Sequence, residues 1–187
     1  MKTIFKNCIL LDGTKNMTAK PGTDVAVENG KIVEIGSVKA QSRDKVIDLS
    51  GKYLMPGLIN LHVHLPAGGR PKNKPLKADE LARLALSSAF MREVTLRICH
   101  SYAMQGLLSG VTTLRAVGGL GNVDTKLRDR INSGKLEGPR ILAANYAIGV
   151  PGGHMVGSVA KGAKTVEEAV SMVDDLASQG VDLIKLM

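Results

Sequence analysis

The chain has 187 residues, a net charge of +8 from 25 basic and 17 acidic side chains, and an apolar fraction of 44%. This apolar content supports a buried core and argues against wholesale disorder. The scarcity of aromatic residues disfavours binding of nucleic acid by base stacking. No apolar run approaches the roughly 20 residues of a membrane span, and the N-terminus lacks a signal-peptide core. We therefore expect a cytoplasmic protein without nucleic-acid or membrane partners, whose cysteines, Cys8 and Cys99, are free thiols.

The positive charge is locally concentrated in only one segment, residues 70–77. This segment is rich in proline and lacks aromatic residues, so we interpret it as a solvated loop and not as a nucleic-acid surface.

The first third of the chain is a series of short strand-like runs separated by turn signals. Such runs occupy residues 3–11, 24–28, 31–35 and 46–49. Asn29-Gly30 stands between two of them, and this dipeptide favours a type I′ hairpin because both turn positions need a positive φ. Residues 1–55 are therefore predicted to form a small antiparallel β module, too small to be stable alone.

From Pro56 onward the pattern changes to strands alternating with helices. Strands are predicted at 57–64, 111–117, 140–144 and 181–187. Helices are predicted at 79–108, at 123–131 and at 166–177, the last one preceded by the capping box Thr165-Val166-Glu167-Glu168. Four strands separated by helices predict an α/β fold of parallel βα units with right-handed crossovers.

The first candidate site is His62-Val63-His64, at the end of the first of these strands. Residues two apart on a strand point to the same side, so both imidazoles, and Asn60 with them, share one face. Neutral imidazoles at a strand end are the ligands that Zn, Fe, Mn or Ni sites use. The alternative is a pair of polar residues at an exposed strand end.

The second candidate is Lys185, inside the apolar run 181–187. An unpaired buried ammonium group is costly. The residue therefore either extends its head to solvent, pairs with an acid, or is converted by CO2 into a carbamate, an anion suited to bridging two metal ions.

The third candidate is His154, in the glycine-rich segment 149–157. Glycines let backbone amides approach a ligand closely, and His154 could donate a hydrogen bond or bind an anion. The alternative is a surface loop with an idle histidine.

Taken together, these segments resemble the opening of a metal-dependent amidohydrolase. The resemblance is carried by residues 48–64 (Asp48 to His64), by 109–115, by Pro151-Gly152-Gly153-His154 and by 181–187. The later segments are similar to the branch containing prolidase-like and imidazolonepropionase-like enzymes.

This resemblance implies a small N-terminal β-sandwich module, left incomplete in residues 1–55. It also implies that residues 56–187 are the first four βα units of a TIM-like (β/α)8 barrel. Such a chain would be the N-terminal part of a hydrolase that cleaves C–N bonds in amides, peptides or cyclic amides with a metal-activated hydroxide.

The resemblance also implies roles for individual residues. His62 and His64 would bind the more buried of one or two divalent ions, with zinc expected, and a carboxylated Lys185 would bridge both. His154 would reach the substrate. The catalytic Asp is expected beyond Met187. The family commonly has Asp at the position of Asn60 and an Arg-Asp pair at Arg115-Ala116.

The expected partners are a small amide or dipeptide-like substrate, a C-terminal half or second chain, and further copies of this chain in a homo-oligomer. The alternative is a truncated or split half-barrel that is inactive alone and acts as an assembly or metal-binding fragment.

Overall fold

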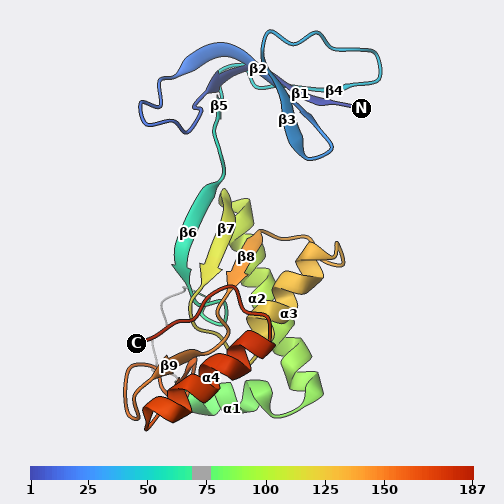
Figure 1. Cartoon of the computed structure of the whole chain (residues 1–187). Helices are drawn as coiled ribbons and strands as arrows, with labels where there is room; N and C mark the ends of the chain where they lie inside the picture. Colours follow the sequence, from blue (N-terminus) through green and yellow to red (C-terminus); the bar gives the residue numbers. More distant parts are fainter. Residues whose placement is uncertain (69–76) are drawn as a thin grey trace. The chain divides into compact units, whose positions relative to one another are not determined.

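The computed structural model describes residues 1–68 and 77–187, so the predicted basic loop lies outside the described residues except for Lys77. The chain divides into two compact units, Met1–Pro56 and Gly57–Met187 (Figure 1). None of the helices within the described ranges is long and apolar enough to cross a membrane.

The unit Met1–Pro56 is built on one five-stranded sheet. Its strands run in the order β3-β2-β1-β4, and β5 also pairs with β1. Their bounds are β1 (Thr3–Leu10), β2 (Lys20–Glu28), β3 (Lys31–Gly36), β4 (Lys45–Asp48) and β5 (Tyr53–Leu54). The expected hairpin is present between β2 and β3, where Asn29 and Gly30 have φ angles of 51° and 73°.

The prediction of an antiparallel module was wrong for half of the pairings. β1 pairs antiparallel with β2, but parallel with β4 and β5. Alternating polarity identifies a strand but not its partner or direction, and here residues 37–44 cross back so that β4 enters beside the start of β1. In the part of the unit that the structure describes, there is a single sheet and no second layer of a sandwich.

Asp24 on β2 is the buried charge of this unit. Its carboxylate accepts hydrogen bonds from Lys6 Nζ at 2.7 Å and from the backbone amides of Asn7 and Val38 at 3.0 and 2.9 Å. Burial raises the pKa of Asp24, but these hydrogen bonds outweigh it and lower the pKa to about 2. The carboxylate therefore ties β1, β2 and the segment after β3 together.

The unit Gly57–Met187 contains a parallel sheet in the order β6-β7-β8. These strands are β6 (Leu58–Val63), β7 (Val111–Ala116) and β8 (Arg140–Ala143). A second parallel pair, β9 (Ala147–Gly149) and β10 (Ala160–Gly162), was not predicted. The helices α2 (Ala89–Leu108) and α3 (Val123–Asn132) cover one face of the three-stranded sheet, and apolar residues between these layers form the main core (Figure 1).

The predicted helix 79–108 is interrupted. It consists of α1 (Ala78–Leu86) and α2, which begins after Ser88. Ser88 has an extended backbone and its Oγ accepts from the Met91 amide at 3.1 Å, so it caps α2. The Ser87-Ser88 pair is thus a helix boundary, which apolar spacing alone did not reveal.

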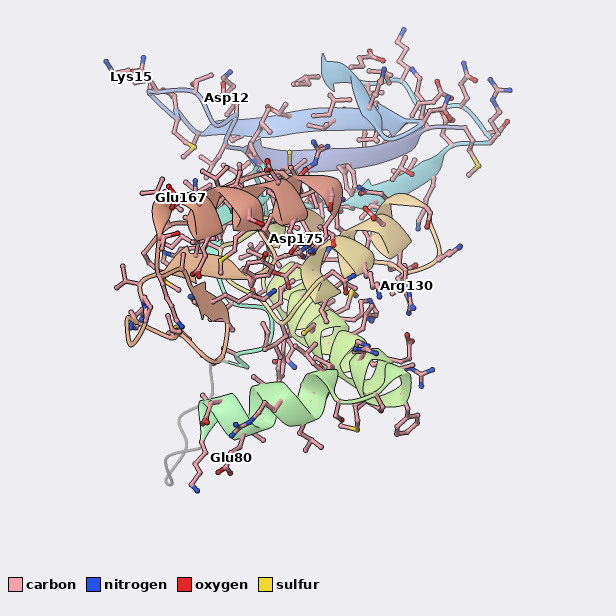
Figure 2. All side chains as sticks on the ribbon, turned by 60° about the horizontal axis from the view of Figure 1, so that its bottom comes forward. Asp12, Lys15, Glu80, Arg130, Glu167 and Asp175 are labelled. Carbon is pink, nitrogen blue, oxygen red and sulfur yellow. The ribbon has the colours of Figure 1, made fainter. Side chains whose placement is uncertain are left out.

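The last helix, α4 (Val166–Ser178), has the predicted cap. Thr165 Oγ1 accepts from the Glu168 amide at 3.2 Å. Farther along α4, Asp175 accepts from Tyr146 Oη at 2.7 Å, which fixes the helix to the segment before β9 (Figure 2). Tyr146, Ile148 and Leu176 form a small core of their own beneath α4.

The predicted strand at 181–187 is reduced to one parallel bridge, between Ile148 and Leu186. The segment nevertheless follows β8 and β9, because Asp182 donates from its amide to the Ala143 carbonyl and Ile148 donates to the Lys185 carbonyl, both at 2.9 Å. Among the described residues, the segment has backbone hydrogen bonds only on the side that faces β8 and β9. Its residues are half-buried or exposed. A regular strand at this position would need a longer ladder.

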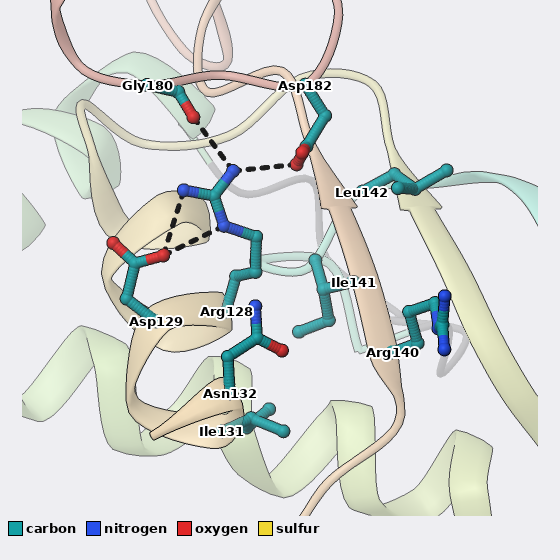
Figure 3. Close-up of a pocket in the computed structure, with 9 residues that line it drawn as sticks. All are labelled: Arg128, Asp129, Ile131, Asn132, Arg140, Ile141, Leu142, Gly180 and Asp182. Atoms are coloured by element: carbon teal, nitrogen blue, oxygen red, sulfur yellow. Dashed lines mark hydrogen bonds and ion pairs between the residues drawn. The ribbon is translucent and has the colours of Figure 1, made fainter.

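Arg128 of α3 holds the start of that segment (Figure 3). Its guanidinium donates to the Gly180 carbonyl at 2.8 Å and to Asp182 Oδ2 at 2.7 Å. Asp182 Oδ2 also accepts from the Ala143 amide at 2.8 Å. These bonds connect α3, β8 and the chain that leads to Lys185.

Asp24→Asn tests the buried ion pair. We expect the variant to destabilise the unit Met1–Pro56 by about 3 kcal/mol, because Lys6 loses its partner. The depressed pKa further predicts that the contribution of Asp24 is present above pH 4 and is lost as the pH falls from 4 to 2. Hydrogen exchange of the β1 and β2 amides across this pH range measures both effects. Glu34→Gln, which removes an exposed partner of Lys2, is the control and should change little; equal effects of the two variants would contradict the assignment.

Candidate metal centre

The two predicted histidines lie at the end of β6. His62 is the second-last residue of the strand and is exposed. His64 comes directly after the strand and is half-buried. Because β6, β7 and β8 are parallel, their carboxyl ends lie at the same edge of the sheet, where α/β proteins place their sites.

The two imidazoles are close to one another. Their ring centroids are 5.3 Å apart, with an angle of 68° between the ring planes. Two imidazoles bound to one tetrahedral ion at about 2.1 Å from each nitrogen would have centroids about 5 Å apart. The separation in this structure therefore fits a shared divalent ion.

A hydrogen bond from His64 to the loop after β7 sets the state of its ring. Nδ1 of His64 lies 3.0 Å from the carbonyl oxygen of Gly118. A carbonyl oxygen only accepts, so Nδ1 carries the proton and the lone pair of the neutral ring is on Nε2. His64 is thus held in the tautomer that can bind a metal through Nε2.

The contact requires glycine at position 118. Val117 donates from its amide to the Val63 carbonyl at 3.0 Å, so the chain after β7 continues beside the histidines. Gly118 has a φ of +153°, and a Cβ at this position would lie 2.9 Å from Nδ1 of His64. Both the backbone conformation and the space exclude a larger residue.

Asn60, where the chain departs from the family pattern, and Arg115, which precedes the second departure at Ala116, have local roles. Asn60 Oδ1 accepts from the backbone amide of His62 at 3.1 Å. Nε of Arg115 donates to the Leu61 carbonyl at 2.6 Å, across from β7 to β6. Both side chains therefore support the backbone of the strand that carries the histidines.

Lys185 is half-buried in the segment that runs beside β9. Among the described residues its side chain has no hydrogen bond or ion pair. His154 is exposed in the loop between β9 and β10, and it too lacks a side-chain partner there. The structure thus brings His62 and His64 together. Lys185 and His154 lie on other elements, in the segment beside β9 and in the loop after β9.

The described residues hold no cluster of three or more His, Cys, Asp or Glu side chains that could bind a metal. Of the predicted site, the structure shows the mutual arrangement of the His62 and His64 rings.

Sequence reasoning missed Asp124, in the first turn of α3. It is fully buried, and neither carboxyl oxygen has a hydrogen-bond partner among the described residues. Its carboxyl lies against Gly119, where any Cβ would collide with it. Burial raises the pKa of Asp124 to about 7. An acidic residue in the first turn of a helix is usually solvated, so the sequence carried no signal of this burial.

Buried Asn145 links the same loop to α3 and α4. Its Nδ2 donates to Thr125 Oγ1 at 3.2 Å and to Gln179 Oε1 at 2.9 Å, and its Oδ1 accepts from the Thr125 amide at 3.1 Å. Its carbonyl accepts from the Gly119 amide at 2.7 Å. The residue therefore fixes the backbone next to Gly118.

Comparison of the sequence with known proteins finds no matching family model. It does find relatives that share part of the chain. A dihydroorotase from Bacillus licheniformis is 38% identical over 82 residues, which are 44% of this chain and 18% of that protein. A 5-methylthioadenosine/S-adenosylhomocysteine deaminase from Thermococcus onnurineus is 40% identical over 68 residues, or 36% of this chain and 16% of that protein.

Solved structures match over nearly the whole chain. A putative prolidase from Bifidobacterium longum has a TM-score of 0.76 and 29% identity, covering 99% of this chain and 40% of that one. A Xaa-Pro dipeptidase with bound methionine has a TM-score of 0.78 and 28% identity, covering 100% of this chain and 47% of that one. These matches support the resemblance of the chain to the metal-dependent amidohydrolase superfamily.

The chain spans less than a fifth of the curated relatives and less than half of the prolidase and dipeptidase chains that it matches. The names of those relatives, dihydroorotase, deaminase, prolidase and dipeptidase, agree with the C–N hydrolase expected from the sequence.

Gly118→Ala tests the link between the glycine and His64. We expect affinity for Zn²⁺ to fall at least about tenfold, because the added methyl group displaces the imidazole and its Nδ1 hydrogen bond. Gly110→Ala is the matched control, since Gly110 also has a positive φ, +97°, but open space around its Cα. Titration calorimetry measures both variants. Equal affinities in the two would rule out the positioning role of Gly118.

Asp124→Asn tests the buried acid. The folded state holds a proton that the unfolded state releases near pH 4, so the free energy of unfolding of the native chain should fall between pH 4 and 7. The fall is on the order of 4 kcal/mol at most. The variant should lack it, whereas Asp129→Asn, on the exposed side of α3, should retain it. Urea denaturation at several pH values decides; a flat profile in the native chain would contradict the burial of an acid.

Proposed function

We propose that this chain is the N-terminal part of a metal-dependent amidohydrolase that cleaves a C–N bond in an amide, peptide or cyclic amide. The observation that carries the proposal is the pair of imidazoles at the end of β6, 5.3 Å apart, with Nδ1 of His64 bound to the Gly118 carbonyl. A strand end with two oriented neutral imidazoles is a metal-binding arrangement.

In this proposal residues 56–187 are the first four βα units of a TIM-like (β/α)8 barrel, and residues 1–55 contribute to a β-sandwich module. The parallel order β6-β7-β8 and the segment 182–187 beside β8 and β9 support the barrel arrangement. The fraction of the prolidase and dipeptidase chains that is covered, 40% and 47%, supports the assignment to one half.

His62 and His64 would hold a divalent ion, with zinc the expected one, and Lys185 would complete the site toward a second ion. When bound, such an ion supplies acidification of a water molecule and polarisation of the substrate carbonyl. The protein's contribution at this end is to hold the His64 ring in one tautomer and to support the backbone of the strand that carries both rings. The bond from Nδ1 to Gly118 and the backbone support from Asn60 and Arg115 serve that purpose.

Lys185 is proposed to act after carboxylation. The ammonium group first releases one proton to solvent. The neutral amine then adds to CO2: an N–C bond forms, one C–O π bond of CO2 becomes an oxygen anion, and a second proton leaves the nitrogen to solvent. A side chain of charge +1 thus becomes an anion of charge −1 with two oxygen ligands. The half-buried position and the lack of a partner among the described residues support this role, because a cation in that place gains nothing from its neighbours.

His154 is proposed to contact the substrate. Its exposed position in the loop between β9 and β10, where its ring has no partner among the described residues, supports this role. The proposed substrate is a small amide or a dipeptide-like molecule, in line with the names of the prolidase and dipeptidase neighbours.

The remaining ligands and the catalytic Asp are proposed to come from a C-terminal half or a second chain, in a homo-oligomeric enzyme. Exposed apolar residues on β6, Leu58, Ile59 and Leu61 at 52%, 63% and 55%, support a partner along this strand.

Metal binding and turnover by the 187-residue chain test the proposal. We expect a Zn²⁺ ion at the histidine pair, lost in His62→Ala and in His64→Ala but kept in His100→Ala. His100 lies on α2, and its Nε2 donates to the Glu137 carbonyl. Failure to bind metal, or equal loss in all three variants, would refute the site.

Hydrolysis of Xaa-Pro dipeptides and dihydroorotate by the loaded chain is then measured. Turnover would show that the chain is active by itself. Metal binding without turnover would assign it the alternative role, an inactive fragment that needs its other half.

The role of Lys185 has its own test. Intact-mass measurement under native conditions in bicarbonate should show the gain of one CO2, absent in Lys185→Ala, and that variant should lose a second metal ion. Lys161→Ala is the control, because Lys161 lies over the Tyr146 ring and is not expected to be modified. Retention of both ions in Lys185→Ala would remove the bridging role.

A further inference from the structure

An apolar cavity adjoins the histidine pair. It has a volume of about 440 Å³ and lies between the loop after β6, the helices α1 and α2, and the loop before β10. The imidazole of His64 is part of its wall, and Leu81, Ala85, Met91, Ile98 and Met155 line the rest. In Figure 2, Glu80 on α1 points away from the body of the unit, so the charged side of this helix faces outward.

The two side-chain hydroxyls in the wall already donate hydrogen bonds to backbone carbonyls. Thr95 Oγ1 donates to the Met91 carbonyl at 2.8 Å, and Ser158 Oγ donates to the Met155 carbonyl at 2.8 Å. Burial, reinforced by Asp124, raises the pKa of the Cys99 thiol to about 12, so it remains neutral. None of the described lining residues is Asp, Glu, Lys or Arg.

We propose that this cavity is the subsite for an uncharged, aliphatic side chain of the amide substrate. That the ligand is an amide substrate rests on the proposed function. That its side chain is uncharged and aliphatic rests on the lining of the cavity. Its volume is within the roughly 300–1,000 Å³ of small-molecule pockets. A charged side chain placed there would lose its hydration without gaining a partner, whereas an aliphatic one exchanges water for carbon and sulfur contacts.

The cavity lies next to His64 and to the segment that carries His154, and this position connects it to the proposed reaction. His64 forms one wall, and Met155, in another wall, directly follows His154 in the chain. A substrate whose side chain occupies the cavity therefore has the rest of its backbone near the strand ends, where the histidine pair lies. The cavity would select substrates by the side chain next to the cleaved bond.

Binding can be measured on the metal-free full chain with two probes, N-acetyl-L-leucinamide and N-acetylglycinamide. Of the eight methionines, Met91 and Met155 line the cavity, so their ¹³C-labelled methyl groups report on it. We expect N-acetyl-L-leucinamide to shift both signals and to bind at least about tenfold more tightly than N-acetylglycinamide. The α-amide of N-acetyl-L-aspartic acid, whose side-chain carboxylate is charged, should not shift these two signals.

Filling the cavity supplies a matched pair of variants. Ala85→Phe places a ring in the cavity and should abolish the leucinamide shifts. Ala89→Phe, at an exposed position outside the described lining, should leave them intact. Circular dichroism establishes that both variants fold; if Ala85→Phe does not fold, the discrimination among the three probes by the native chain still decides.

Equal binding of leucinamide and glycinamide, or shifts confined to methionines elsewhere such as Met17 and Met172, would overturn the subsite. Because these measurements use no metal, their failure leaves the metal-site test untouched. A chain that binds leucinamide here but no zinc would refute the proposed function and keep the cavity.

Discussion

The hydrogen bond between Nδ1 of His64 and the Gly118 carbonyl is the interaction on which the candidate site depends. It joins the end of β6 to the loop after β7 and determines which ring nitrogen is free. The loop that supplies the carbonyl is itself fixed, since the Asn145 carbonyl accepts from the Gly119 amide and the Asp124 carboxyl packs on Gly119. One carbonyl position thus relies on residues from α3, from α4 and from the segment after β8.

The glycines of this loop combine two constraints. At position 118 the positive φ and the imidazole exclude a side chain, and at position 119 the buried carboxyl of Asp124 does. The unpartnered acid costs stability above its raised pKa, and the close packing that surrounds it holds the loop in place.

Local sequence signals predicted the local features of the fold and of the site. Asn29-Gly30 predicted a turn because its requirement for positive φ does not depend on distant residues, and Thr165 predicted a cap for the same reason. His62 and His64 were found because residues two apart on a strand share a face. The parallel pairing of β1 with β4, the break at Ser88 and the incomplete strand at 181–187 depend on contacts between distant segments, which periodicity does not encode. The role of Gly118 was missed for that reason too, since a glycine after a strand is equally compatible with a plain turn.

Nitrogen-15 NMR of the histidine rings tests the central claim most directly. In the metal-free chain, the account predicts that His64 is the Nδ1–H tautomer, with its Nε2 free. On addition of Zn²⁺, the Nε2 signal of His64 and one ring-nitrogen signal of His62 should shift together at one equivalent, while the Nδ1 proton of His64 is retained. An Nε2–H tautomer of His64, or histidine signals that do not respond to zinc, would contradict the account.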